Sequence, residues 1–140
     1  MSNYTKILVA LDIYAESHPV LEKALQIASS SKHINIVYVT VPMVNYQPFG
    51  MAYEGDFFNE LCLQSKAKLK ELADKFKIPE TQIFSPVGNP ADEIHNTAND
   101  IKADLIVIGT HGRSGLKLLL GSTANGVLHG VKCDVLAVKV

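Results

Sequence analysis

The chain has 140 residues, of which 47% are hydrophobic and 19% charged, and its formal net charge is -1. This length predicts one domain over residues 1–140, and the near-neutral charge argues against binding to nucleic acid or to an anionic membrane surface. The apolar run at residues 7–11 is cut short by Asp12, so neither a signal peptide nor a membrane span is predicted. We therefore expect a cytoplasmic protein in which Cys62 and Cys133 are reduced thiols.

Apolar runs typical of strands alternate along the chain with apolar positions at helical spacing. The expected strands are residues 6–11, 34–41, 82–87, 105–109 and 134–140. The expected helices are one that Ser17 caps and the serines at 29–31 stop, followed by 56–76, 90–102 and 122–129. Prolines and glycines mark residues 42–55 as a long surface loop or lid, and Pro86 places the third strand near a sheet edge.

This alternation predicts the α/β fold class, with a single doubly wound five-stranded parallel sheet in the order 3-2-1-4-5 and helices on both faces. In such sheets ligands bind beyond the carboxyl ends of the strands, where the strand order reverses. Strands one and four would be neighbours at that point. Asp12 and the segment 109–121 would therefore meet at one crevice.

The stretch from Leu105 to Asn125 carries the strongest functional signal. An unbroken apolar strand opens into a loop with four glycines, and Ser122 and Thr123 can begin a helix after it. Glycines let backbone N–H groups approach phosphate oxygens, and a helix N-terminus points further N–H groups at the same place. Positive charge comes from His111, Arg113 and Lys117. The layout favours a nucleotide, although the glycines could instead only make a tight connection between strand and helix.

Several stretches of the chain resemble the universal stress protein family, and the resemblance covers its whole length. They are Ala10-Leu11-Asp12, the run from Ala103 to Arg113, the run from Leu120 to Ala124, and the run from Cys133 to Val138. Nucleotide-binding members of that family carry G-x-x-G, nine residues, and then G-[S/T]. Here Gly109-x-x-Gly112 is followed by eight residues and Gly121-Ser122, a shorter gap that some bacterial members share. The resemblance therefore implies ATP as the ligand, with or without Mg²⁺.

Each candidate residue also has a structural interpretation. The Asp12 carboxylate could accept hydrogen bonds from ribose hydroxyls or hold Mg²⁺, or it could cap a loop N–H. Val39 matches the family position whose backbone meets the adenine edge, but by residue type it is a strand valine. Ser122 could face a phosphate or act as a helix N-cap, and His111 and Arg113 could face solvent. The nucleotide-binding set that we predict is Asp12, Val39, Gly109, Thr110, His111, Gly112, Arg113, Gly121, Ser122 and Thr123.

The leading hypothesis is a stress-response protein that binds ATP or a related adenine nucleotide. Little or no turnover is expected, because no general base stands out in the loop. The alternative is a scaffold without nucleotide that acts through protein contacts. In both cases the exposed edge of the last strand, and the family resemblance, predict a homodimer through residues 134–140. A nucleotidyl transferase ranks last. Such an enzyme needs a catalytic histidine motif after the first strand, and the histidine found there, His18, is followed by Pro19 rather than by a small residue. No metal site is predicted, since none of His18, His33, His95 and His129 has zinc-ligand spacing.

Overall fold

The computed structural model describes residues 4–11, 18–41, 54–110 and 122–139, with residues 54–58 and 122 described by their backbone alone. The strands are β1 (Ile7–Ala10), β2 (Ile34–Val37), β3 (Ile83–Phe84), β4 (Leu105–Gly109) and β5 (Asp134–Val138). The helices are α1 (His18–Ala28), α2 (Glu54–Lys75), α3 (Pro90–Ile101) and α4 (Ser122–Leu128), and short 3-10 turns cover Ser31–His33 and Glu80–Gln82. Strands and helices alternate as predicted.

All five strands form one parallel sheet in the order β3-β2-β1-β4-β5, which confirms the predicted topology. β1 is the central strand, since Ile7 pairs with Ile34 of β2 on one side and with Leu105 of β4 on the other. All four residues of β1 are buried. A parallel strand covered on both faces needs apolar side chains at every position, which explains the unbroken run Ile7–Ala10.

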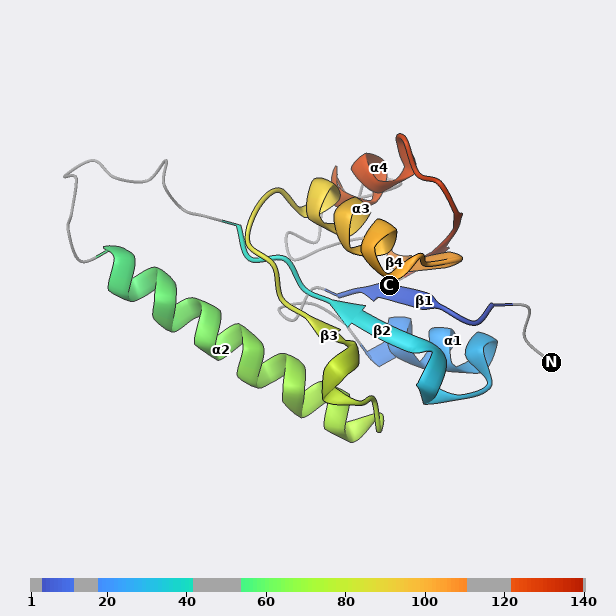
Figure 1. Cartoon of the computed structure of the whole chain (residues 1–140), viewed down its shortest axis with the longest axis horizontal. Coiled ribbons are helices and arrows are strands. Elements are labelled where there is room, and N and C mark those ends of the chain that lie inside the picture. The colour runs from blue at the N-terminus through green and yellow to red at the C-terminus, as the bar shows by residue number, and fades with distance from the viewer. Residues whose placement is uncertain (1–3, 12–17, 42–53, 111–121, 140) are drawn as a thin grey trace.

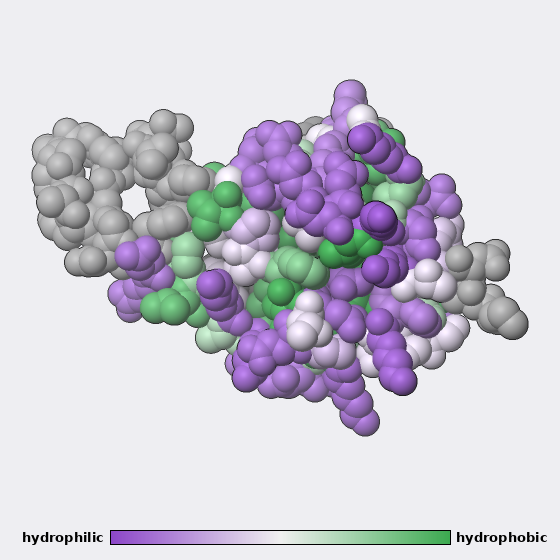
Figure 2. Space-filling model, in the orientation of Figure 1, coloured by the Kyte–Doolittle hydropathy of each residue, from purple (hydrophilic) through white to green (hydrophobic). Residues whose placement is uncertain are grey.

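Helices cover both faces of the sheet, with α1 and α2 on one side and α3 and α4 on the other (Figure 1). The two core clusters follow this division, because Ile7 and Val9 pack toward α1 and α2, whereas Leu8 and Ala10 pack toward α3 and α4. Most of the molecular face in Figure 2 is hydrophilic, with apolar areas that are small and separate. No helix in the described part of the chain has the length and apolar character needed to cross a membrane.

β2 and β3 are shorter than predicted, and proline chemistry explains the difference. Backbone pairing between the two segments continues past the strands, because Tyr38 N donates to Phe84 O (3.0 Å) and Thr40 N donates to Pro86 O (3.0 Å). Pro86 has no N–H to donate in return, so the regular ladder stops there and resumes only as the bridge between Thr40 and Val87. The prediction that this strand lies at a sheet edge is confirmed.

The long second helix differs from its predicted boundaries by one or two residues. α2 begins at Glu54, so the last two residues of the predicted loop belong to the helix, while residues 42–53 lie outside the described residues, as does the predicted cap Ser17. Ser65 interrupts the apolar stripe of α2 yet is fully buried, because its hydroxyl donates to Leu61 O (2.9 Å) in the preceding turn.

Helix α4 is short and is held in place by contacts with α3. A Cβ placed on Gly126 would lie 2.6 Å from the Cβ of Ala91, so only glycine lets the two helices approach this closely. Two histidines lie against the C-terminal carbonyls of α4, with His95 Nε2 2.7 Å from Val127 O and His129 Nδ1 2.9 Å from Asn125 O. Both carbonyls belong to the last turn of the helix, where side chains commonly provide additional hydrogen-bond partners.

We expect Gly126→Ala to destabilise the protein by about 1–2 kcal/mol. The new methyl group would collide with Ala91, and overpacking costs about 1–3 kcal/mol, which exceeds the gain of up to about 1 kcal/mol that alanine gives a helix. Urea denaturation measures the change. Adding Ala91→Gly should restore most of the lost stability by removing the opposing methyl group, whereas independent effects in the double-mutant cycle would contradict the proposed contact.

Candidate functional site

The carboxyl ends of three strands lie side by side at the point where the strand order reverses. Ala10 of β1 pairs with Ile108 of β4, and beyond the strand Leu11 N donates to Val37 O of β2 (2.9 Å). Across β4, Thr110 N donates to Val138 O of β5 (2.9 Å). The segments that follow Leu11 and Thr110 therefore leave the sheet from neighbouring strands, which is where doubly wound folds bind ligands.

Five of the ten predicted site residues belong to the described part of the chain. Gly109 ends β4, Thr110 follows it, Ser122 begins α4, and Thr123 is half-buried in the first turn of that helix. The fifth is Val39, two residues before the end of the described segment 18–41. The others, Asp12, His111, Gly112, Arg113 and Gly121, lie outside the described residues.

Val39 offers backbone groups rather than a side chain. Its side chain is buried in the cluster under α3 and α4. The pairing between β1 and β2 ends with the hydrogen bond from Leu11 to Val37, and no backbone hydrogen bond joins Val39 to another described residue. Within the described residues, the N–H and C=O of Val39 therefore have no backbone partner.

The two helices on this side of the sheet differ in what their N-terminal turns would offer an anion. In α3, Asn89 Oδ1 already accepts a hydrogen bond from Asp92 N (3.1 Å), and Asp92 and Glu93 place two carboxylates in the first turn. The first turn of α4 contains no acidic residue. Since carboxylates repel phosphate and compete for the same N–H groups, α3 is the less suitable of the two for a phosphate.

Thr40 is a feature of this region that the sequence analysis did not single out. Its side chain is 2% exposed, and its hydroxyl has no hydrogen-bond partner in the structure. The sequence does not reveal this feature, because whether a threonine hydroxyl has a hydrogen-bond partner depends on the atoms that pack around it in the fold.

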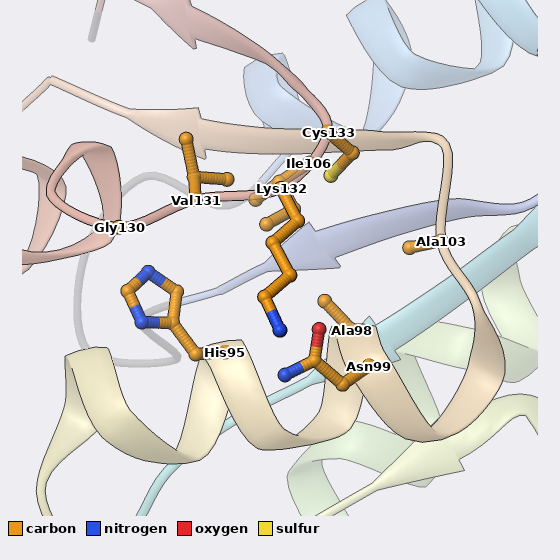
Figure 3. A pocket seen from close by; sticks show the side chains of 9 residues that line it. All are labelled: His95, Ala98, Asn99, Ala103, Ile106, Gly130, Val131, Lys132 and Cys133. Atoms are coloured by element: carbon orange, nitrogen blue, oxygen red, sulfur yellow. The ribbon is translucent and has the colours of Figure 1, made fainter.

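A separate small hollow lies at the opposite end of the sheet. It is bordered by the C-terminal half of α3 and by residues 130–133, and Figure 3 shows Lys132 extending across it toward Asn99. Because Ala103 and Cys133 precede β4 and β5, this hollow is at the amino ends of the strands and is distinct from the predicted nucleotide site. Among the described residues, no group of three or more His, Cys, Asp or Glu side chains could hold a metal ion.

Cys133 borders that hollow and is half-buried. Burial raises the pKa of its thiol, and the negative charges of Asp134 and Asp104 raise it further. The raised pKa leaves less thiolate at neutral pH, so this arrangement suits a structural cysteine rather than a nucleophile. Its position immediately before β5 agrees with the predicted strand entry.

A five-stranded parallel sheet in this order, with helices on both faces, defines a doubly wound α/β protein. Comparison with known proteins gives the family. The profile of the universal stress protein family matches residues 3–139, and the chain belongs to that family. Universal stress protein A homolog 2 of Coxiella burnetii is 38% identical over 143 residues, covering 100% of this chain and 98% of the relative.

Solved structures agree with this assignment. Universal stress protein UspA from Lactobacillus plantarum superposes with a TM-score of 0.80 at 21% identity, covering 99% of both chains. A universal stress protein in complex with cAMP superposes with a TM-score of 0.61 at 28% identity, covering 99% of this chain and 98% of its own. The chain is therefore a stress protein of this family, and one of its structural relatives holds an adenine nucleotide.

We expect the thiol of Cys133 to be alkylated more slowly at neutral pH than a free cysteine derivative. In a Cys62→Ser variant, the rate of reaction with iodoacetamide from about pH 7 to about pH 10 should follow a profile displaced to higher pH than that of N-acetylcysteine, because the thiolate is the reactive form. Asp134→Asn should move the profile back toward lower pH. A profile at or below that of N-acetylcysteine would contradict the raised pKa.

Proposed function

We propose that this universal stress protein binds ATP at the carboxyl ends of β1, β2 and β4. Asp12 would contact the ribose or a Mg²⁺ ion, and the backbone of Val39 would meet the adenine edge. Phosphates would lie against the loop residues Gly109 to Arg113 and the segment Gly121 to Thr123. Binding would favour an ordered form that is competent for partners, with little or no ATP turnover.

The observation that carries this proposal is the pairing of β1 with β4, in which Ala10 lies beside Ile108. Because of this pairing, the segment that contains Asp12 and the glycine loop start from adjacent strands. The free backbone of Val39 on the next strand adds a third group at the same end of the sheet. The cAMP complex of a relative at 28% identity supports an adenine nucleotide as the ligand class.

We also propose a homodimer through the outer edge of β5, and the backbone geometry of that strand supports it. β5 pairs with β4 alone among the described strands. Since Val138 O accepts from Thr110 N, the backbone groups of Val138 face β4. Direction alternates along a strand, so the N–H and C=O of Ala137 face the open edge and can pair with a second copy of the strand. Dimerisation is compatible with nucleotide binding and with the scaffold alternative.

Addition of ATP and Mg²⁺ should raise the melting temperature of the purified protein. At about 100 times the Kd, the free energy of unfolding increases by about 2.7 kcal/mol, which corresponds to roughly 8 °C for a chain of this size. Differential scanning fluorimetry measures the shift, and chromatography of the nucleotide after incubation measures turnover. The absence of a shift at millimolar ATP would reject nucleotide binding and favour the scaffold.

An acidic residue far from the site provides the matched control for that experiment. Asp12→Asn should weaken ATP binding by about tenfold or more, since a hydrogen bond to a charged group contributes about 1.5–3 kcal/mol. Asp100→Asn makes the same change of charge at an exposed position near the end of α3 and should bind ATP as the wild type does. Equal affinities for the two variants would remove Asp12 from the site.

Ala137→Pro should convert the dimer into a folded monomer. Proline at this position removes an N–H that faces the open edge, and edge strands tolerate such a residue. Light scattering coupled to size-exclusion chromatography measures the mass. Leu136→Pro is the control, because the Leu136 N–H faces β4 and its loss should lower the melting temperature of the subunit itself. A dimer that persists in Ala137→Pro would exclude the β5 edge as the interface.

A further inference from the structure

Helix α4 depends on its neighbours for its position. It has seven residues, and a helix this short is only marginally stable by itself. Ala124 and Val127 are buried in the core cluster on the α3 side of the sheet, and Gly126 lies against Ala91 of α3. Apolar packing has no preferred direction, so these contacts hold α4 near α3 without fixing its rotation or its shift along the helix axis.

A directional contact also joins the two helices. His95 stands in the middle of α3, and its Nε2 atom lies 2.7 Å from Val127 O in the last turn of α4. A carbonyl oxygen only accepts hydrogen bonds, so Nε2 is protonated and is the donor. Figure 3 shows the imidazole rising from α3 toward the chain that leads to Gly130. This bond therefore fixes where the end of α4 lies along α3.

The proposed ligand contacts form two groups that different parts of the fold hold in place. Asp12 and Val39, assigned to the ribose and the base, follow the strands β1 and β2. Ser122 and Thr123, assigned to the phosphates, belong to α4. A displacement of α4 would move the second group relative to the first, and binding groups must be held within about 0.5 Å of their productive geometry. Contacts with the phosphates therefore depend on what holds α4.

We propose that His95 is a positioning residue of the nucleotide site, which holds α4 through Val127 O and thereby strengthens binding of the phosphate chain. This inference rests on the proposed ATP binding and adds a residue that acts on the same site from a distance. His95 itself touches no ligand, since it borders the hollow at the amino ends of the strands. Loss of its hydrogen bond should weaken ATP binding and leave adenosine binding unchanged.

Two amide variants that differ in reach test the proposal. His95→Gln keeps an N–H donor at about the reach of Nε2, whereas His95→Asn is one carbon shorter and does not place a donor at Val127 O. Isothermal titration calorimetry should show ATP binding weakened by about 2- to 12-fold in His95→Asn, the range expected for one hydrogen bond. His95→Gln should bind ATP nearly as the wild type does, and all three proteins should bind adenosine equally.

A second histidine at the end of α4 provides the matched control. His129 Nδ1 lies 2.9 Å from Asn125 O, and this contact joins two residues four apart without involving α3. His129→Asn should therefore leave the affinities for ATP and for adenosine unchanged. If His95→Asn does not fold, His95→Leu replaces it, because leucine also lacks the donor and fills more of the half-buried position with apolar atoms.

The outcomes separate a positioning role from a structural one. A lowered melting temperature with unchanged ATP affinity in His95→Asn would make the contact purely structural and overturn the proposal. An equal loss of ATP and adenosine binding would also overturn it, since the base contacts would then depend on α4 as well. A wild type that binds ATP without a selective loss in the variant rejects this inference alone. If the wild type binds no ATP, the proposed function itself fails and this inference fails with it.

Discussion

The pairing of β1 with β4 is the contact on which the rest of this structure depends. It joins the amino-terminal and carboxy-terminal halves of the sheet, and it runs in register from Ile7 beside Leu105 to Ala10 beside Ile108. At one end of this pair, Asp104 secures the start of β1, because its carboxylate accepts from Thr5 N (2.9 Å) and Lys6 N (3.1 Å). At the other end, the same pair holds Ala10 beside Ile108, so the strands that precede the two predicted nucleotide-binding segments end as neighbours.

Rigid supports surround the proposed ligand end. β1 is buried on both faces, α3 begins at a proline preceded by the asparagine cap Asn89, and α4 is held against α3 by the contact of Gly126 with Ala91. Loops on a rigid framework are the usual location of binding residues, because they can adapt without loss of the fold. The same end of the sheet also holds two features that cost stability, since among the described residues the hydroxyl of Thr40 and the backbone of Val39 have no hydrogen-bond partner. Their presence there is consistent with a binding site.

The sequence predicts the fold because its signals are local. The apolar runs Ile7–Ala10 and Leu105–Gly109 identify strands buried on both faces, and Asn89-Pro90 identifies the start of α3. The extent of β3 was less predictable. Pro86 has no N–H, and whether this ends the strand depends on whether the neighbouring strand places a carbonyl acceptor opposite it. Boundaries of α2 shifted because the residues before its apolar stripe are polar and carry no clear cap.

The site was only partly predictable for a different reason. Glycine spacing and strand order indicate where a ligand would lie, but hydrogen-bond satisfaction is a property of three-dimensional packing. Ser65 and Thr40 are both small hydroxyl residues at buried positions, yet one bonds to the preceding helical turn and the other has no partner. In the same way, the contact between His95 and Val127 O joins two helices whose sequences give no indication of it.

The register of β1 has a consequence for how the polypeptide acquires its structure. Ile7 pairs with Ile34 on one side. Its partner on the other side, Leu105, is synthesised only after the three helices and two strands that lie between β1 and β4. During synthesis the first three strands can associate, yet one edge of β1 stays without its partner until β4 emerges. Because closing so long a loop is entropically costly, folding should be slow for a chain of this length. The exposed edge of β1 is then the point at which a nascent chain is most open to aggregation or to a chaperone.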